Sequence, residues 1–142
     1  MSSVVAYTFK TFPKTSLLEK EFPHLFIFDK LKQDIEPFCA YLLKVKPDFV
    51  IGVAHSKTKS VFEPIAINNI HGHKISAAEP EELALNTPSC PSFPPSPRPS
   101  NSFCNYSMFK IQSFINQQQL PSKQIFAHLM LEDIPRLPKI IE

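Results

Sequence analysis

Four short apolar runs in the chain have the length and composition of buried strands. They are residues 4–9, 25–28, 49–53 and 125–131, and each is rich in β-branched, leucine or aromatic side chains. A continuous apolar run of this length, bounded by polar residues, is typical of a strand covered on both faces of a sheet. We therefore predict four buried strands, the last of which carries a histidine, His128.

Two longer segments show the period of amphipathic helices. Between residues 31 and 45, apolar side chains recur every three or four positions, as they do in a helix with one buried face. Asp34 is the predicted N-cap of this helix, which places Pro37 in the first turn, where proline is tolerated. The helix is expected to end before Pro47. Residues 103–119 show the same spacing and form the second predicted helix.

The order of these elements indicates the fold class. The helix at 31–45 lies between the strands at 25–28 and 49–53, and a strand–helix–strand unit implies a mostly parallel sheet in an α/β protein. Ligands of such sheets bind at the carboxyl ends of the strands. The loop from His55 to Ser60, directly after the third strand, is therefore a predicted functional position.

The segments between and after these elements are less regular. Residues 15–22 are expected to add one or two helical turns, and the tail, residues 132–142, contains two prolines and is predicted to be irregular. Six of the 16 residues from 86 to 101 are proline, so this stretch is predicted to be a loop with Cys90 exposed. We favour a connecting loop, although its P-x-x-P spacings could also dock on a proline-binding module.

The composition is that of a globular protein. With 142 residues, 43% hydrophobic and 20% charged, the chain is expected to form a single domain over residues 1–142. A net charge of +2 without a basic cluster argues against nucleic acid as a partner. The chain has only two glycines, which excludes a glycine-rich phosphate loop. His71 and His73 could be half of a metal site, but such sites need three or four ligands, so we predict no metal.

The predicted location follows from the cysteines and from the apolar runs. The N-terminus lacks the features of a signal peptide, and no apolar run approaches the length of a membrane span, so no membrane association is expected. Three cysteines without paired spacing are typical of free thiols in a reducing cytoplasm.

Three residues have the chemistry of a cysteine hydrolase, which needs a thiol, a histidine to share its proton and a third group to orient the imidazole. Cys104 is expected near a helix N-terminus, where the helix dipole favours the thiolate. His128 lies within an apolar strand, and Glu63 is flanked by apolar residues. Each has a structural alternative, since free cysteine is often a small core residue and a strand histidine is often a satisfied one.

The motifs around these residues resemble those of the pyroglutamyl peptidase I family. GVAHSKTKSVFEPIAIN (52–68) is similar to the family stretch Gly-Leu-Ala-Gly-Gly-Arg leading to Glu-Arg-x-Ala-x-Asn. FCNYSMF (103–109) resembles the nucleophile motif around Cys-Asn, and FAHLM (126–130) resembles Phe-x-His-x-Pro. TFKTF (8–12) is similar to the loop Gly-Phe-x-Pro-Phe. The motifs occur in family order, as expected for a shortened and divergent member of this cysteine peptidase family.

The resemblance implies a fold, an activity and a role for each matching residue. The fold would be a three-layer α/β/α sandwich with a mostly parallel central sheet. The chain would hydrolyse an N-terminal pyroglutamyl residue from peptides in the cytoplasm, without a cofactor, and a homo-oligomer is compatible with it. Cys104 would be the nucleophile, His128 the base and Glu63 the group that orients the histidine. Phe9 and Phe12 would line the pocket for the lactam ring.

Some family positions are changed. The arginine after Gly-Gly is Lys57, a candidate oxyanion or charge contact, although lysine lacks the planar fork of arginine. Pro64 follows the glutamate, and Pro99 and Ser100 replace the small residues before the nucleophile. The alternative hypothesis is therefore a catalytically inactive member that acts as a binding or interaction protein through its proline-rich loop.

Overall fold

A five-stranded sheet forms the centre of the protein. The computed structural model describes residues 2–142, and its strands are ordered β2-β1-β3-β7-β4. Four of them run parallel: β1 (Val4–Phe9), β2 (Leu25–Phe28), β3 (Phe49–His55) and β7 (Lys123–Leu129). The short β4 (Val61–Phe62) pairs antiparallel with β7 at the edge. The four predicted strands and the mostly parallel sheet are confirmed, with β3 reaching His55.

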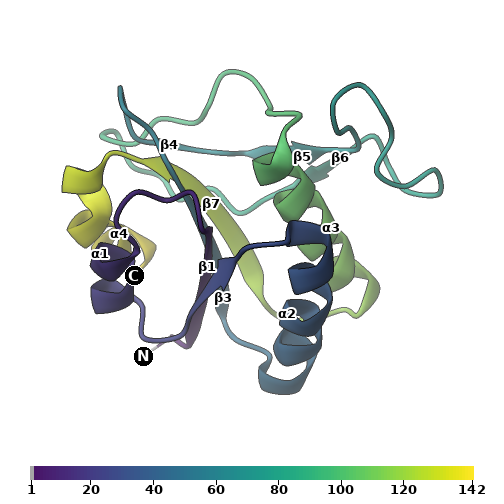
Figure 1. Ribbon diagram of the computed structural model, residues 1–142, viewed down its shortest axis with the longest axis horizontal. Coiled ribbons are helices and arrows are strands. Elements are labelled where there is room, and N and C mark those ends of the chain that lie inside the picture. Colours follow the sequence, from purple (N-terminus) through teal and green to yellow (C-terminus); the bar gives the residue numbers. More distant parts are fainter. Residues whose placement is uncertain (1) are drawn as a thin grey trace.

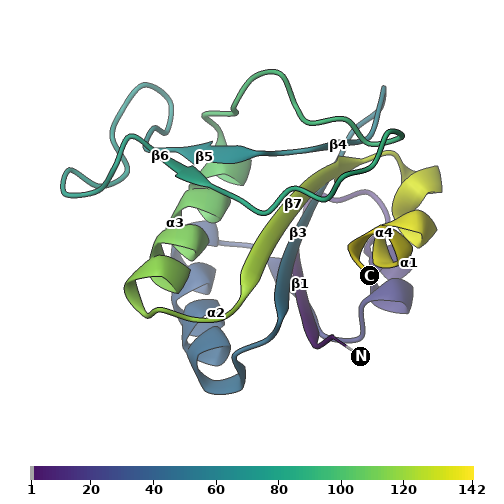
Figure 2. The ribbon, with the colours of Figure 1, turned by 180° about the vertical axis from the view of Figure 1, so that it is seen from behind.

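Helices cover both faces of this sheet (Figures 1 and 2). One layer holds α2 (Leu31–Val45) and α3 (Phe103–Gln117), which pack against each other. The other holds α1 (Thr15–Glu21), a 3-10 helix η1 (Leu131–Arg136) and α4 (Leu137–Ile141). The predicted three-layer α/β/α arrangement is therefore confirmed. Among residues 2–142, none of the helices combines the length and apolar character needed to cross a bilayer.

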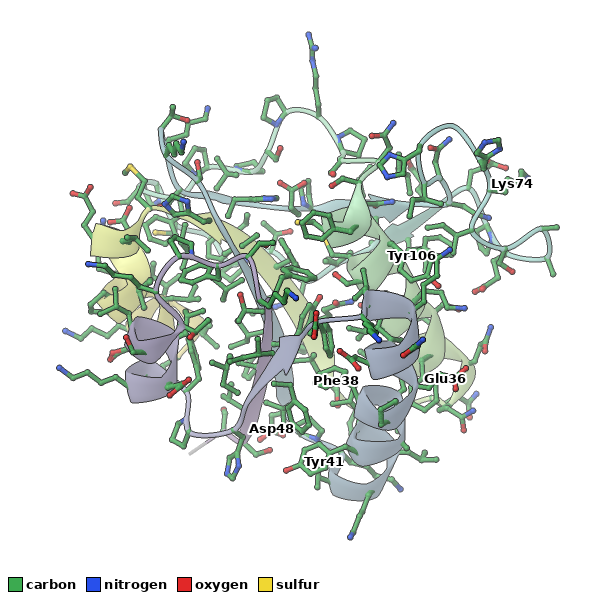
Figure 3. All side chains as sticks on the ribbon, in the orientation of Figure 1. Glu36, Phe38, Tyr41, Asp48, Lys74 and Tyr106 are labelled. Carbon is green, nitrogen blue, oxygen red and sulfur yellow. The ribbon has the colours of Figure 1, made fainter. Side chains whose placement is uncertain are left out.

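The core is divided into two clusters, one on each face of the sheet. Successive residues of a strand point to opposite faces, so Tyr7 of β1 packs on the side of α2 and α3 while Ala6 packs on the side of α1 and α4. Phe38 of α2 points toward the sheet and lies edge-on to the Tyr7 ring at 5.4 Å between centroids (Figure 3). The Tyr7 hydroxyl donates a hydrogen bond to Gln124 Oε1 at 2.8 Å, so this polar group is satisfied inside the core.

The start of α2 differs from the prediction. The helix begins at Leu31, so Asp34 lies inside its first turn and is not the N-cap, and Pro37 lies in the helix interior. The Asp34 carboxylate accepts hydrogen bonds from the backbone N–H groups of Asp29 and Lys30 at 2.8 and 3.0 Å. It therefore satisfies backbone donors at the helix start from within the helix, the task that a cap usually performs from outside.

The C-terminal tail is helical, and the prediction of an irregular tail is wrong. Pro138 lies in the first turn of α4, where its missing N–H group costs no hydrogen bond. The buried side chains of Ile134 and Leu137 belong to the core cluster on that face of the sheet. Tertiary packing thus holds two short helices that local sequence preference alone does not indicate.

The proline-rich loop is joined to the sheet by backbone hydrogen bonds. Phe62 of β4 donates from its N–H to the carbonyl of Pro94 at 3.1 Å and accepts from the Ser96 N–H at 2.7 Å. Phe93 is 1% exposed and lies in the core. Cys90 is half-buried against the same cluster, so the prediction that it is exposed is wrong. The loop is therefore a packed part of the fold.

A second, two-stranded sheet lies alongside α3 (Figure 2). It is formed by β5 (Ile65–Ile67) and β6 (Glu82–Ala84), which pair antiparallel. Both strands contact α3. The chain enters β5 directly from β4 through Glu63 and Pro64, which places this small sheet beside the end of the main sheet (Figure 1).

Candidate active site

A small cavity lies at the carboxyl ends of β1, β3 and β7. Strands are added on opposite sides of the β1–β3 pair as the chain continues, so the strand order reverses there, and this is where ligands of open α/β sheets bind. The cavity has a volume of about 230 Å³, below the roughly 300–1,000 Å³ of pockets for drug-sized ligands. We call it the Cys104 cavity. Its lining residues are Phe9, Thr11, Phe12, Ala54, His55, Phe103, Cys104 and His128.

Cys104 is the second residue of α3, which begins at Phe103. The residue is only 6% exposed. The pKa of its thiol is raised to about 12, mainly by burial and in part by the nearby charge of Glu63, while a hydrogen bond with Ser102 acts in the opposite direction. The thiol is therefore protonated near neutral pH and needs a neighbouring base to become a nucleophile.

His128 and Glu63 form a pair beside this thiol. His128 lies on β7, and Glu63 directly follows β4, where its backbone N–H donates to the carbonyl of Phe126 at 2.9 Å. His128 Nδ1 lies 3.2 Å from Glu63 Oε2. The glutamate side chain is 3% exposed and the histidine side chain 23%. A buried carboxylate at this nitrogen fixes the orientation of the ring and leaves its other nitrogen, Nε2, for chemistry.

Asn105 is a residue of this site to which the sequence assigned no role beyond the Cys-Asn motif. Its side chain is completely buried. Its Oδ1 accepts from the Ile67 N–H at 2.8 Å, and its Nδ2 donates to the carbonyls of Ile67 and Asn69 at 2.8 and 2.9 Å. These bonds tie the start of α3 to β5, four residues after Glu63. Asn105 therefore connects the segment of the cysteine to the segment of the glutamate.

Two further lining residues were missed as individual candidates. Phe103 is 44% exposed although it is a large apolar side chain, and its ring lies edge-on to Phe9 at 5.0 Å between centroids. The His55 ring lies 6.1 Å from the Phe12 ring. His55 opens the loop that was predicted to be functional because it follows a buried strand. The available signal for Phe103 was its place directly before the cysteine in the motif FCNYSMF.

Of the six predicted site residues, the structure brings five to this end of the sheet. Phe9, Phe12, Cys104 and His128 line the Cys104 cavity, and Glu63 contacts His128. Lys57 is exposed in the loop after β3 and does not line the cavity. Its contact with an oxyanion stays a prediction.

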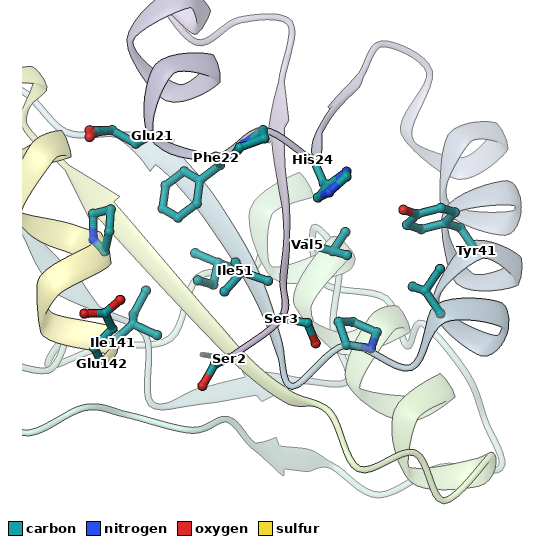
Figure 4. A pocket seen from close by; sticks show the side chains of 15 residues that line it. Ser2, Ser3, Val5, Glu21, Phe22, His24, Tyr41, Ile51, Ile141 and Glu142 are labelled. Atoms are coloured by element: carbon teal, nitrogen blue, oxygen red, sulfur yellow. The ribbon is translucent and has the colours of Figure 1, made fainter.

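Other features of the surface lack this chemistry. A larger cavity of about 590 Å³ lies toward the amino end of β1, between the start of this strand, the end of α2 and α4 (Figure 4). Its only imidazole is His24, and no cysteine lines it. Within residues 2–142, no group of three or more His, Cys, Asp and Glu side chains is placed to hold a metal ion.

Solved structures with the same fold are peptidases. The pyrrolidone carboxyl peptidase from Thermococcus litoralis aligns over 99% of this chain and 92% of its own, with a TM-score of 0.77 and 18% identity. Pyroglutamyl peptidase I from Bacillus amyloliquefaciens covers 99% and 94%, with a TM-score of 0.77 and 15% identity. The Thermus thermophilus pyrrolidone carboxyl peptidase covers 98% of each chain, with a TM-score of 0.72 and 13% identity.

These likenesses concern the fold. No protein-family model and no curated protein sequence matches the chain. The fold expected from the resemblance in sequence is confirmed: the chain has the fold of the pyrrolidone carboxyl peptidases over nearly its whole length.

Proposed function

We propose that this protein is a cysteine exopeptidase that removes an N-terminal pyroglutamyl residue from peptides. The observation that carries the proposal is the Cys104 cavity, in which a thiol and an imidazole line one small space and the imidazole is held from behind by a buried carboxylate. The fold shared with pyroglutamyl peptidases supports the same conclusion. Nucleophile, base and orienting group are the three parts that such chemistry requires.

In the first step, the Cys104 thiol gives its proton to His128 Nε2 as the sulfur attacks the pyroglutamyl carbonyl carbon. A carbon–sulfur bond forms, and the carbonyl electron pair moves to the oxygen, which becomes an oxyanion. Because burial raises the thiol pKa to about 12, proton transfer accompanies attack and no resting thiolate is needed. Glu63 holds His128 Nδ1–H and stabilises the imidazolium that forms.

The start of α3 supplies donors for the oxyanion. No side chain caps this helix, so the first backbone N–H groups are without a side-chain partner. The N–H of Cys104 itself is one of them and lies beside the sulfur. Backbone donors in such a position stabilise the developing charge, and losing one typically costs about a hundred- to thousandfold in rate.

The tetrahedral intermediate then breaks down to a thioester, and water hydrolyses this thioester in a second stage. His128 returns the proton to the leaving amine, the carbon–nitrogen bond breaks, and a thioester between Cys104 and the pyroglutamyl group remains. Water, deprotonated by His128, attacks this thioester and releases pyroglutamate, and the thiol regains its proton. No metal or cofactor enters this sequence.

The lactam ring is assigned to the aromatic part of the Cys104 cavity. Phe9 and Phe12 line it together with Phe103. An apolar slot of this size suits a small ring and excludes larger side chains. Free Cys39, Cys90 and Cys104 favour a reducing compartment, the cytoplasm, as the place of action.

The test is hydrolysis of a pyroglutamyl fluorogenic amide by the purified full chain. Release that is lost in Cys104→Ala is the expected result. A matched control is Cys90→Ala, which removes a thiol outside the cavity and should retain activity. If no Cys104-dependent release occurs at high enzyme concentration, the catalytic proposal fails and a non-catalytic binding function takes its place.

A further inference from the structure

A second cavity adjoins the Cys104 cavity at His55 and His128. Its volume is about 310 Å³, and we call it the basic cavity. It lies between the loop after β3, the edge strand β4 and the proline-rich loop. Its lining residues are His55, Ser56, Thr58, Lys59, Val61, Glu63, Ser96, Pro97, Arg98, Ser100 and His128. Only His55 and His128 line both cavities, so the two spaces meet at these imidazoles.

The charged residues that line the basic cavity are mostly cationic. Lys59 and Arg98 are the two cationic residues among those that line it; both are exposed, and neither forms an ion pair anywhere in residues 2–142. The one acidic lining residue is Glu63, which is buried and engaged with His128. The cavity therefore presents positive charge that no side chain of the described protein neutralises.

The two cationic residues lie on segments that are fixed to the rest of the fold. Lys59 precedes Ser60, whose hydroxyl donates to Asp133 Oδ2 at 2.6 Å and accepts from the Met130 N–H at 3.0 Å. Arg98 follows the part of the proline-rich loop that pairs with Phe62. The Arg98 carbonyl also accepts from the Ser96 hydroxyl at 3.0 Å. Both cations are thus presented at the cavity by anchored backbone.

We propose that the basic cavity binds the residue that follows pyroglutamate and that Lys59 and Arg98 select a carboxylate there. The inference rests on the proposed function, because His128 must protonate the leaving amine and the leaving residue must therefore lie beside this ring. The pyroglutamyl ring is assigned to the Cys104 cavity, and the basic cavity, which shares His55 and His128 with it, is the adjoining space for the remainder of the peptide. The carboxylate is either an Asp or Glu side chain or the free C-terminus of a dipeptide.

Binding to the Cys104→Ala variant tests the subsite without turnover. Four peptides serve as probes: pyroglutamyl-aspartic amide, its neutral asparagine analogue, and pyroglutamyl-alanine with a free or an amidated C-terminus. Measured by calorimetry at low ionic strength, the acidic member of at least one pair should bind about fivefold more tightly, as expected for two partly exposed ion pairs. The preference should shrink at high salt. The pair that shows the preference identifies the source of the carboxylate.

Two variants in the Cys104→Ala background show where the preference arises. Lys59→Ala combined with Arg98→Ala should abolish it. Lys44→Ala, which removes a positive charge from the exposed surface of α2, should retain it. Equal affinities within both pairs, or a preference that survives loss of both cavity cations, would overturn the subsite.

The outcome is separable from that of the proposed function. Hydrolysis of the neutral fluorogenic amide without any charge preference overturns the subsite and leaves the peptidase in place. A charge preference without hydrolysis supports the subsite and removes the catalytic proposal. If Cys104→Ala binds none of the four peptides, the subsite is overturned whatever the amide shows.

Discussion

His128 Nδ1 lies 3.2 Å from Glu63 Oε2, and the second oxygen of that carboxylate, Oε1, is buried without a hydrogen-bond partner in residues 2–142. A buried carboxylate is stable only with a compensating partner, so the contact with His128 is the main compensation that this glutamate has. The pair orients the ring at the cavity that Cys104 also lines. Its two members come from β7 and from the chain after β4, neighbouring strands at the sheet edge.

Replacing Glu63 with glutamine removes the charge but keeps the shape. We expect Glu63→Gln to lower kcat by at least about 100-fold, because the imidazolium loses its stabilising charge and the ring loses its fixed tautomer. The effect should fall mainly on kcat, because Glu63 acts through His128 and does not line the Cys104 cavity that is assigned to the lactam ring. Steady-state kinetics on the fluorogenic amide checks this, with the melting temperature as the control for folding. An unchanged kcat would remove Glu63 from the proposed mechanism.

Two buried thiols and one buried phenol are expected to make the folded protein less stable at alkaline pH. Burial raises the pKa of the Cys104 thiol to about 12 and that of Cys39 to about 11, and it raises the pKa of Tyr7 as well. Above about pH 8.5 thiols ionise in the unfolded chain but not in the folded one. The unfolded state then binds fewer protons, so the free energy of unfolding must fall as pH rises, by up to about 1.4 kcal/mol per pH unit and group.

Urea denaturation between about pH 8.5 and 11 measures this slope. Cys104→Ala removes one of the three groups and should make the decline visibly shallower, because the thiol pKa difference between folded and unfolded chain no longer contributes. Stability below about pH 8 should keep its pH dependence in this variant. Identical slopes for the two proteins above pH 8.5 would contradict a raised thiol pKa.

The sequence predicted the elements whose signal is local. The run VVAYTF predicts β1, and the helical period of residues 31–45 predicts α2. In both, the apolar residues of the buried face lie close together in the sequence. The start of α2 was misplaced because the Asp34 carboxylate acts from inside the helix. The tail was misjudged because packing of Ile134 and Leu137 against the sheet overrides its two prolines.

The sequence predicted those residues of the candidate site that belong to family motifs and lie near the ends of strands. Cys104, His128 and Glu63 could be named from the sequence, and the structure gathers them at one end of the sheet. The role of Asn105 was not predictable, because its three partners are backbone groups of residues that lie more than 35 positions away. Nothing in the local pattern of residues 101–111 indicates where Ile67 lies.

Loss of the Asn105 side chain should loosen the start of α3. Asn105→Ala removes the partner of the N–H and carbonyl of Ile67 and of the Asn69 carbonyl, all of them partly buried, which costs about 1–3 kcal/mol of unfolding free energy. Asn116→Ala, on the exposed face of the same helix, removes a single hydrogen bond from Gln112 and should cost less, about 0.5 kcal/mol. Urea denaturation compares the two. If both variants lose the same small amount, Asn105 does not anchor the helix.

Gly52 is the position of β3 where the core leaves no room for a side chain. A Cβ atom there would lie 2.6 Å from the Tyr7 hydroxyl oxygen and in collision with the Phe126 ring. Gly52→Ala should therefore destabilise the protein by about 1–3 kcal/mol through overpacking. Gly72→Ala has open space around it, so its cost should come only from the positive φ of 89°. Thermal unfolding of both variants separates crowding from backbone strain, and a neutral Gly52→Ala would contradict the close packing.

The packing of Phe93 determines whether the proline-rich loop can be deleted without loss of folding. Its ring packs against Phe62 at 5.7 Å between centroids, and the Arg136 guanidinium lies 5.1 Å from the ring centre. Phe93→Ala should cost about 3–5 kcal/mol, as expected for a buried phenylalanine. Ser92→Ala, at the exposed neighbouring position, should stay within about 0.5 kcal/mol.

Excising residues 88–99 would remove Phe93 from the core together with the exposed prolines, so it cannot separate loss of binding from loss of folding. Pro91→Ala and Pro97→Ala change exposed rings only and should leave stability nearly unchanged. If a Phe93→Ala protein is as stable as the wild type in urea, the loop is held less firmly than its contacts indicate. Excision would then become a valid test of the binding alternative.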